Sequence, residues 1–160
     1  MEARRQARYD RIYKQLAELI AGRSPTLLAA MSTINAVLHA KMGHHSWTGF
    51  YFVHRPDELH VGPYQGAVAC QILRGGGVCN EAVRRHVPVV VPDVEAFPGH
   101  IACDARSRSE IVIPLFRGNQ VFGVFDADSS LLAAFSDEDV APLQRILSLL
   151  KPFSHETSQV

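Results

Sequence analysis

The three cysteines are the residues of this sequence best suited to covalent chemistry. Cys70, Cys79 and Cys103 all lie in the middle third of the chain. An odd number of cysteines does not fit a set of structural disulfides, and in a reducing compartment it indicates reactive thiols or a metal site. The nucleophilic form of a cysteine is its thiolate, which forms most easily at an exposed position or at the N-terminus of a helix.

The local sequence favours different roles for the three thiols. Cys103 lies in a segment predicted as a loop, so it is the first candidate for a nucleophile; the alternative is a small buried apolar side chain. Cys79 follows a glycine turn at the start of a predicted helix, which favours a reactive thiol, whereas Cys70 lies in an apolar run predicted as a strand. A metal site of these cysteines and His100 would have irregular ligand spacing without a Cys-x-x-Cys pair, which disfavours it.

Three acidic residues form a second candidate group. Asp126 and Asp128 are two residues apart at the end of one predicted strand, so they point to the same face of it. If that strand pairs with the preceding one through a turn at 117–119, Glu110 falls near both. Clustered carboxylates repel each other unless a cation or a shared proton is present, and a substrate ammonium group would serve. A solvated strand end beside a turn is the alternative.

Two aromatic residues and a glycine run complete the candidates. Trp47 and Tyr51 are four residues apart on a predicted strand, so they share a face and can wall a pocket or pack in the core. Gly75-Gly76-Gly77 lacks the pattern of a phosphate-binding P-loop. It is interpreted as a flexible turn or as backbone that closes over a pocket.

Periodicity and turn signals define the elements that must position these residues. Helices are predicted at 2–20, 25–41, 78–85 and 136–150, strands at 47–53, 59–61, 67–73, 109–116 and 120–128, and an irregular segment at 88–108. Ser24 is predicted to cap the second helix, with Pro25 at its first position, and Ser136 to cap the last helix, which contains Pro142. The sum is an α+β domain with a central antiparallel sheet of about five to six strands. We expect the N- and C-terminal helices on one face and a long, loop-rich pocket on the other.

Length and composition limit the class of protein. The chain has 160 residues, zero formal net charge and 47% apolar residues, which fits one domain over 1–160 with a hydrophobic core that needs no metal or disulfide. Its parts are N-terminal helices at 1–42, sheet and pocket at 47–128 and a C-terminal helix at 136–151. The neutral balance argues against a nucleic-acid or membrane-surface binder. Without an apolar leader or spanning segment, the chain is expected to be cytoplasmic.

Several segments resemble the free methionine-(R)-sulfoxide reductases, a family built on the GAF domain. The matching segments are Trp47-x-Gly49-Phe50-Tyr51, Gly62-Pro63-Tyr64-Gln65-Gly66, Ala69-Cys70, Gly77-Val78-Cys79, Val91-Pro92-Asp93-Val94, Phe97-Pro98-Gly99-His100-Ile101-Ala102-Cys103-Asp104, Ser109-Glu110-Ile111-Val112 and Gly123-Val124-Phe125-Asp126-Ala127-Asp128-Ser129. The chain departs from the family pattern at Gly76, where a basic residue is usual, and at Asn80-Glu81, where Gly-Thr is usual. These departures fall in the segment that helps form the pocket lid.

The resemblance implies a role for each matching position. Cys103 corresponds to the catalytic cysteine, Cys70 to the resolving cysteine, and Cys79 to a third cysteine that can also form the disulfide. The acids Glu110, Asp126 and Asp128 correspond to substrate-binding residues, and Trp47 and Tyr51 to the walls of the side-chain pocket.

The implied reaction is the reduction of free L-methionine-(R)-sulfoxide. The Cys103 thiolate attacks the sulfoxide sulfur, a carboxylic acid protonates the oxygen, and the resulting sulfenic acid condenses with Cys70 or Cys79. Thioredoxin then restores the thiols. No metal or organic cofactor is expected, and a homodimer through the terminal helices is the oligomer that the resemblance suggests. The alternatives are a GAF module that binds a small ligand without turnover and a thiol redox sensor, which would not need the acids.

Overall fold

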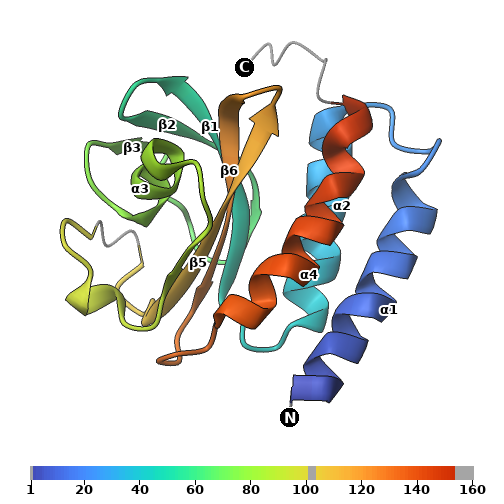
Figure 1. Ribbon diagram of the computed structural model, residues 1–160, viewed down its shortest axis with the longest axis horizontal. Coiled ribbons are helices and arrows are strands. Elements are labelled where there is room, and N and C mark those ends of the chain that lie inside the picture. Colours follow the sequence, from blue (N-terminus) through green and yellow to red (C-terminus); the bar gives the residue numbers. More distant parts are fainter. Residues whose placement is uncertain (1, 101–103, 154–160) are drawn as a thin grey trace.

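The sheet at the centre of the molecule separates two unequal layers. A computed structural model describes residues 2–100 and 104–153. Their elements are α1 (Glu2–Ile20), α2 (Leu27–Lys41), β1 (Trp47–Arg55), β2 (Glu58–Gln65), β3 (Ile72–Arg74), α3 (Val78–Arg85), β4 (Val89–Val91), η1 (Val94–Ala96), β5 (Ser109–Arg117), β6 (Gln120–Ser129), α4 (Asp137–Leu147) and η2 (Ser148–Phe153). Within these residues the six strands form one antiparallel sheet in the order β3-β2-β1-β6-β5-β4. Helices α2 and α4 cover one face with α1 packed on their outer side, and α3 covers the other face (Figure 1), which confirms the predicted α+β architecture.

Alternation along the strands gives each face of the sheet its own core. Phe50, Ile111 and Phe125 are fully or almost fully buried on the face toward α2 and α4. Their neighbours in sequence, among them Tyr51 and Val124, belong to a second cluster on the face toward α3. Because successive side chains of a strand point to opposite faces, the larger core fixes the sheet against the helices and leaves the other face to build a pocket.

The start of α4 is fixed to α1 through one buried carboxylate. Ser136 caps the helix as predicted, in a capping box with Asp139. Asp139 accepts hydrogen bonds at 2.9 Å from Arg5 Nη1, Tyr9 Oη and the backbone N–H of Ser136. The side chain of Asp139 is fully buried, so its charge depends on these donors.

We expect Asp139→Ala to lower the free energy of unfolding by about 3 kcal/mol or more, because it leaves the buried Tyr9 phenol without its acceptor, breaks the half-buried ion pair with Arg5 and removes the helix cap. The matched control is Asp10→Ala, which removes the exposed pair with Arg145 and should cost no more than about 0.5 kcal/mol. Chemical denaturation of both variants measures the difference. Equal losses would show that Asp139 does not stabilise the contact between α1 and α4.

Two predicted boundaries at the helices are wrong. The N-cap of α2 is Thr26, not Ser24: its backbone is extended and its hydroxyl accepts a hydrogen bond from the N–H of Ala29. The last α-helix ends at Leu147 and continues as the 3-10 helix η2, which contains Pro152. Pro142 is accommodated inside α4 without delaying its start.

Two predictions in the middle of the chain also need correction. The strand predicted at 67–73 is only Ile72–Arg74, because Gly66 turns the chain with φ at +118° and the following carbonyls pair with side chains of the pocket instead of a neighbouring strand. The segment predicted as irregular at 88–108 contains the short strand β4 and the 3-10 helix η1. In the part of the chain that the structure describes, no helix is long and apolar enough to span a bilayer.

Candidate active site

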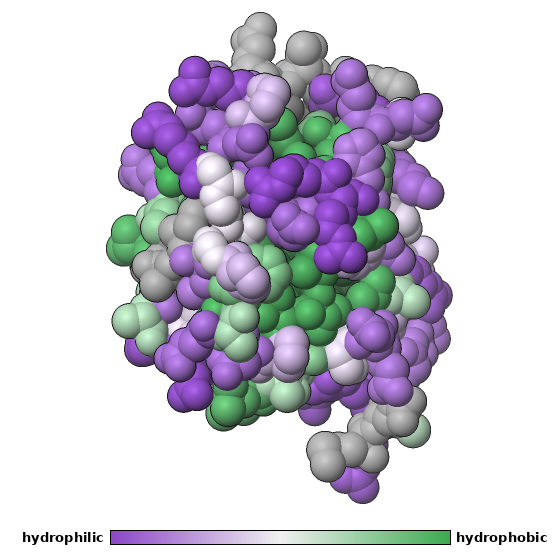
Figure 2. Space-filling view, turned by 60° about the vertical axis from the view of Figure 1, so that its left-hand side comes forward, coloured by the Kyte–Doolittle hydropathy of each residue, from purple (hydrophilic) through white to green (hydrophobic). Residues whose placement is uncertain are grey.

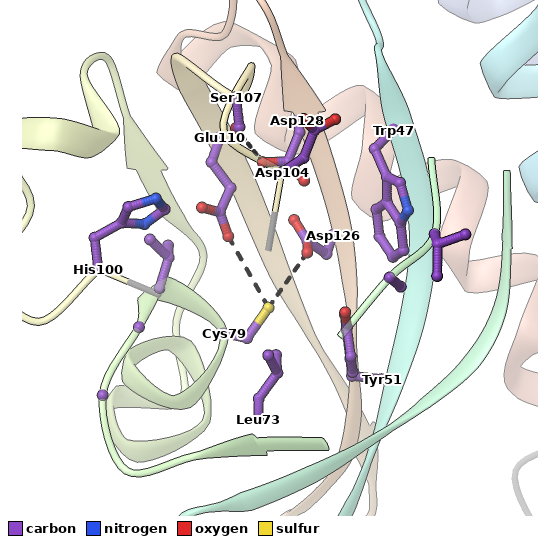
Figure 3. Close-up of a pocket in the computed structure, with 15 residues that line it drawn as sticks. Trp47, Tyr51, Leu73, Cys79, His100, Asp104, Ser107, Glu110, Asp126 and Asp128 are labelled. Atoms are coloured by element: carbon purple, nitrogen blue, oxygen red, sulfur yellow. Dashed lines mark hydrogen bonds between the residues drawn. The ribbon is translucent and has the colours of Figure 1, made fainter. Parts of the chain in front are cut away.

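A pocket lies between the sheet and α3, on the face away from the large core. Its empty space, including the open mouth, is about 580 Å3. It is lined by aromatic, acidic, glycine and thiol groups: Trp47, Tyr51, Val68, Ala69, Leu73, Gly76, Gly77, Val78, Cys79, His100, Asp104, Ser107, Glu110, Asp126 and Asp128 (Figure 3). Of the predicted site residues, these include both aromatic residues, all three acids and Cys79. Val68 is 82% exposed at the pocket, and Figure 2 shows apolar surface among polar residues on this side of the molecule.

Strand register brings the three acids together. The hairpin of β5 and β6 pairs Glu110 directly with Asp128, and Val112 with Asp126. Asp126 and Asp128 therefore lie in adjacent rows on the face that Glu110 also occupies. The predicted proximity of the three carboxyl groups is confirmed, and the alternative of a fully solvated strand end is wrong, since Glu110 and Asp126 are only 6% and 5% exposed.

The aromatic wall rises from β1, the neighbour of β6. Trp47 is opposite Asp128 in the register of the two strands, and its ring stacks on Tyr51 with centroids 5.8 Å apart. Gly49 lies between them, and a Cβ at this position would come within 2.3 Å of the Trp47 ring. Glycine at position 49 thus lets the indole lie flat across its own strand. Both aromatic side chains are buried and also line the pocket. The two alternatives for this pair, core packing and a pocket wall, therefore both apply.

Cys79 lies under the acid cluster at the start of α3. Its thiol donates a hydrogen bond to Asp126 Oδ2 at 3.5 Å and lies 4.0 Å from Glu110 Oε1, as Figure 3 shows. Burial, followed by the charges of Asp126 and Glu110, raises the pKa of this thiol well above its ordinary value. From its place at a helix N-terminus, the sequence predicted a lowered pKa for this thiol. That prediction is wrong because α3 directs the thiol into an apolar and acidic interior.

The acids themselves are held toward their protonated forms. Burial, reinforced by the neighbouring carboxylates, raises the pKa of Glu110 and of Asp126 well above the ordinary range. Burial raises the pKa of Asp128 to about 6, against the hydrogen bond from the Ser107 hydroxyl, which lowers it. Glu110 and Asp126 therefore tend to keep their protons close to neutral pH. Asp128 is the acid of the cluster that ionises most easily.

Cys70 lies in the loop between β2 and β3, not in a strand as predicted. It is half-buried, and its carbonyl accepts a hydrogen bond from the Tyr51 hydroxyl at 3.2 Å. Cys70 is disulfide-bonded, whereas Cys79 is a free thiol. Cys103 lies outside the described residues. The described residues nearest to it on either side, His100 and Asp104, both line the pocket.

The unusual residues of the glycine segment make contacts with one another. A Cβ on Gly76 would come within 2.6 Å of the Gly99 carbonyl oxygen, so the absence of a side chain lets these two backbones meet beside the pocket. Asn80 donates a hydrogen bond to the Gly76 carbonyl at 3.0 Å. Arg84 pairs with Glu81 at 2.9 Å and with the Gly75 carbonyl at 3.0 Å. The departures at 76, 80 and 81 thus belong to one connected arrangement that fixes the segment.

Three residues at the site were given no role from the sequence. The Ser107 hydroxyl donates a hydrogen bond to Asp128, the Tyr64 ring stacks on Trp47 with centroids 5.4 Å apart, and His100 lines the pocket with a pKa lowered by burial. Tyr64 and His100 both lie in segments that match the family, so the sequence could have indicated a role at the site for each of them. Ser107 had none, because only folding brings it against β6.

Comparison with known proteins agrees with this site. A GAF domain model matches residues 26–151. The chain is 40% identical to the free methionine-R-sulfoxide reductase of Escherichia coli (strain K12) over 144 residues, which cover 89% of this chain and 86% of the relative. It is 39% identical to GAF domain-containing protein A of Dictyostelium discoideum over 91% of this chain and 92% of that protein.

A solved structure is similar over nearly the whole fold. The free methionine-R-sulfoxide reductase of Neisseria meningitidis, determined in complex with its substrate, superposes with a TM-score of 0.87. The sequence identity is 41%, and the match covers 93% of this chain and 90% of that one.

Proposed function

The chain belongs to the GAF-domain family of free methionine-R-sulfoxide reductases, and we propose that it reduces free L-methionine-(R)-sulfoxide with Cys103 as nucleophile. The observation that carries the proposal is a cluster of three buried or partly buried acids facing a stacked aromatic wall in one pocket. His100 and Asp104, on the two sides of the segment that contains Cys103, line the same pocket, which supports access of that thiol to a bound ligand.

The pocket suits both ends of the proposed substrate. The faces of Trp47 and Tyr51 offer an apolar surface for the methylene groups and the methyl group of methionine sulfoxide. A carboxylate in the acid cluster offers a partner for the substrate ammonium group, which a peptide-bound methionine lacks. Preference for the free amino acid follows from this charge.

The acids divide between two tasks. Asp128 has a pKa of about 6 and accepts a hydrogen bond from Ser107, so we assign it as the ionised partner of the ammonium group. Glu110 and Asp126, whose pKa values burial raises further, hold the proton that the sulfoxide oxygen needs. A carboxylic acid kept neutral near pH 7 is an effective general acid.

The reaction balances with two thiols. The Cys103 thiolate attacks the sulfoxide sulfur, the oxygen is protonated, and methionine leaves while Cys103 becomes a sulfenic acid, so the substrate gains the two electrons that the cysteine loses. A second thiol displaces water from the sulfenic acid and forms a disulfide. A dithiol of the thioredoxin type then reduces this disulfide by exchange.

We assign the second thiol to Cys70. Cys79 is 3% exposed, and its thiol pKa is raised by burial and by the acids, which makes it a poor nucleophile and a poor target for an external reductant. Cys70 is half-buried in a loop and is disulfide-bonded.

We also propose that residues 1–160 form one domain that dimerises through its terminal helices, which analytical ultracentrifugation would test.

The direct test is consumption of NADPH by thioredoxin reductase and thioredoxin in the presence of the protein and methionine-(R)-sulfoxide. We expect turnover with the (R)-isomer and release of one methionine for each NADPH. The N-acetylated sulfoxide, without the ammonium charge, should be at least about 100-fold poorer in kcat/KM. Ligand binding without NADPH consumption would favour a GAF sensor, and oxidation without methionine release would favour a redox sensor.

A further inference from the structure

Cys79, Glu110 and Asp126 form a donor set of the kind that holds a metal ion. One atom from each, the thiol sulfur and two carboxyl oxygens, lies within 4.8 Å of the others. The three residues are 3%, 6% and 5% exposed. They come from three elements, α3, β5 and β6, that are already fixed by the sheet and its second core.

The separations of these donors match a tetrahedral ion. Zinc bonds of about 2.3 Å to sulfur and about 2.0 Å to oxygen place the two ligand atoms about 3.5 Å apart at the tetrahedral angle. The Cys79 sulfur is 3.5 Å from Asp126 Oδ2 and 4.0 Å from Glu110 Oε1. The distance to Asp126 thus equals the tetrahedral value, and the distance to Glu110 exceeds it by about 0.5 Å.

A second observation points to a ligand at the same place. Asp126 Oδ1 is a buried carboxyl oxygen that has no hydrogen-bond partner among the described residues. An unpaired buried acceptor costs free energy unless a cation or a donor arrives. Asp126 and Cys79 both line the open pocket, so an ion has a path from solvent to this oxygen.

The charge balance distinguishes this set from the other candidate cluster in the described residues. On the hairpin of β1 and β2, Glu58 groups with His54 and His60, but its carboxylate already accepts hydrogen bonds from Arg55 and Arg74. Two guanidinium groups oppose a dication there. The pocket has the opposite balance, with three carboxyl groups and a thiol facing one another.

We propose that Cys79, Glu110 and Asp126 form a reversible binding site for a thiophilic dication such as Zn2+ or Cd2+ inside the pocket. The sulfur binds as thiolate and the oxygens as carboxylates, so the thiol proton and the carboxyl protons leave to solvent as the metal enters. A bound dication would occupy the oxygens that face the reacting group of a ligand.

Cadmium titration tests the site without catalysis. The full chain carrying Cys70→Ser and Cys103→Ser retains Cys79 as its one thiol, so ultraviolet absorption of a cadmium–thiolate bond reports this residue alone. We expect one Cd2+ per chain, and affinity that rises at least tenfold from about pH 6 to about pH 8 as the released protons become easier to lose. Calorimetry in buffers of different ionisation enthalpy should show more than one proton released per ion.

Further substitutions in the same background separate this site from nonspecific binding. Cys79→Ser should remove the absorption, and Asp126→Asn should weaken binding at least tenfold. The matched control is Asp104→Asn, which removes a pocket carboxylate that pairs with Arg106 and should weaken binding less than about threefold. Absence of the cadmium–thiolate absorption, equal affinity after Cys79→Ser, or equal effects of Asp126→Asn and Asp104→Asn would overturn the proposal. Oxidised wild type, in which Cys79 remains free, repeats the titration should the Ser variants fail to fold.

Discussion

Cys103→Ser should abolish turnover of methionine-(R)-sulfoxide, with kcat at least about 1000-fold below wild type. A serine hydroxyl is scarcely ionised at neutral pH and cannot accept the oxygen as a sulfenic acid, so the first covalent step has no substitute. The coupled NADPH assay measures the loss, and unchanged circular dichroism shows that the variant is folded. Turnover at the wild-type rate would disprove the assignment of Cys103.

The two other cysteines provide matched controls for this result. Cys70→Ser should release one methionine per chain and then stop, because the sulfenic acid forms but is not converted to a disulfide. Cys79→Ser should still form the disulfide after one turnover, since Cys79 is a free thiol under the acids. Peptide mapping by mass spectrometry identifies the bonded pair. A disulfide that depends on Cys79 and not on Cys70 would reverse the assignment of the second thiol.

The second large effect is expected at Asp126. Asp126→Asn should lower kcat by about 100-fold or more, because it removes one of the two carboxyl groups that we assign to supply the proton for the sulfoxide oxygen. The same change should stabilise the folded protein at neutral pH by about 1 kcal/mol or more, since it removes a buried acid whose raised pKa obliges the protein to bind a proton on folding. For a chain of this length, that gain raises Tm by about 2–4 °C.

The pH dependence of stability provides an independent measurement of the same cluster. The folded pKa values of the acids are raised, so the folded state keeps protons that the unfolded state loses above about pH 4. Stability is therefore lost as pH rises from about 4 through about 6 and beyond. Asp126→Asn should flatten this slope, whereas Glu95→Gln, at an exposed acid, should not. Equal slopes of stability against pH in wild type and Asp126→Asn would show that the folded state does not raise the pKa of Asp126.

Local sequence signals predicted most of the elements because each signal depends on neighbouring residues. Apolar spacing determined α1 and α2, and the glycine turn at 117–119 determined the pairing that brings Glu110 to the two aspartates. The bounds of the short strand β3 were not predicted in this way. Its preceding apolar residues form hydrogen bonds with Trp47 and Tyr51, which are distant in sequence.

What the sequence by itself determined is the set of reacting groups: the thiols, the three acids on one face of a hairpin, and the aromatic pair on one face of a strand. Only the tertiary structure decided how these groups behave. The position of Cys79 in the first turn of a helix suggested an activated thiol, but packing of α3 over the sheet buries that thiol against Asp126 and raises its pKa. Folding of the segment before β5 likewise brings the Ser107 hydroxyl to Asp128, to which it donates a hydrogen bond. Desolvation and charge proximity depend on every element that surrounds a group, and spacing along the chain does not contain that information.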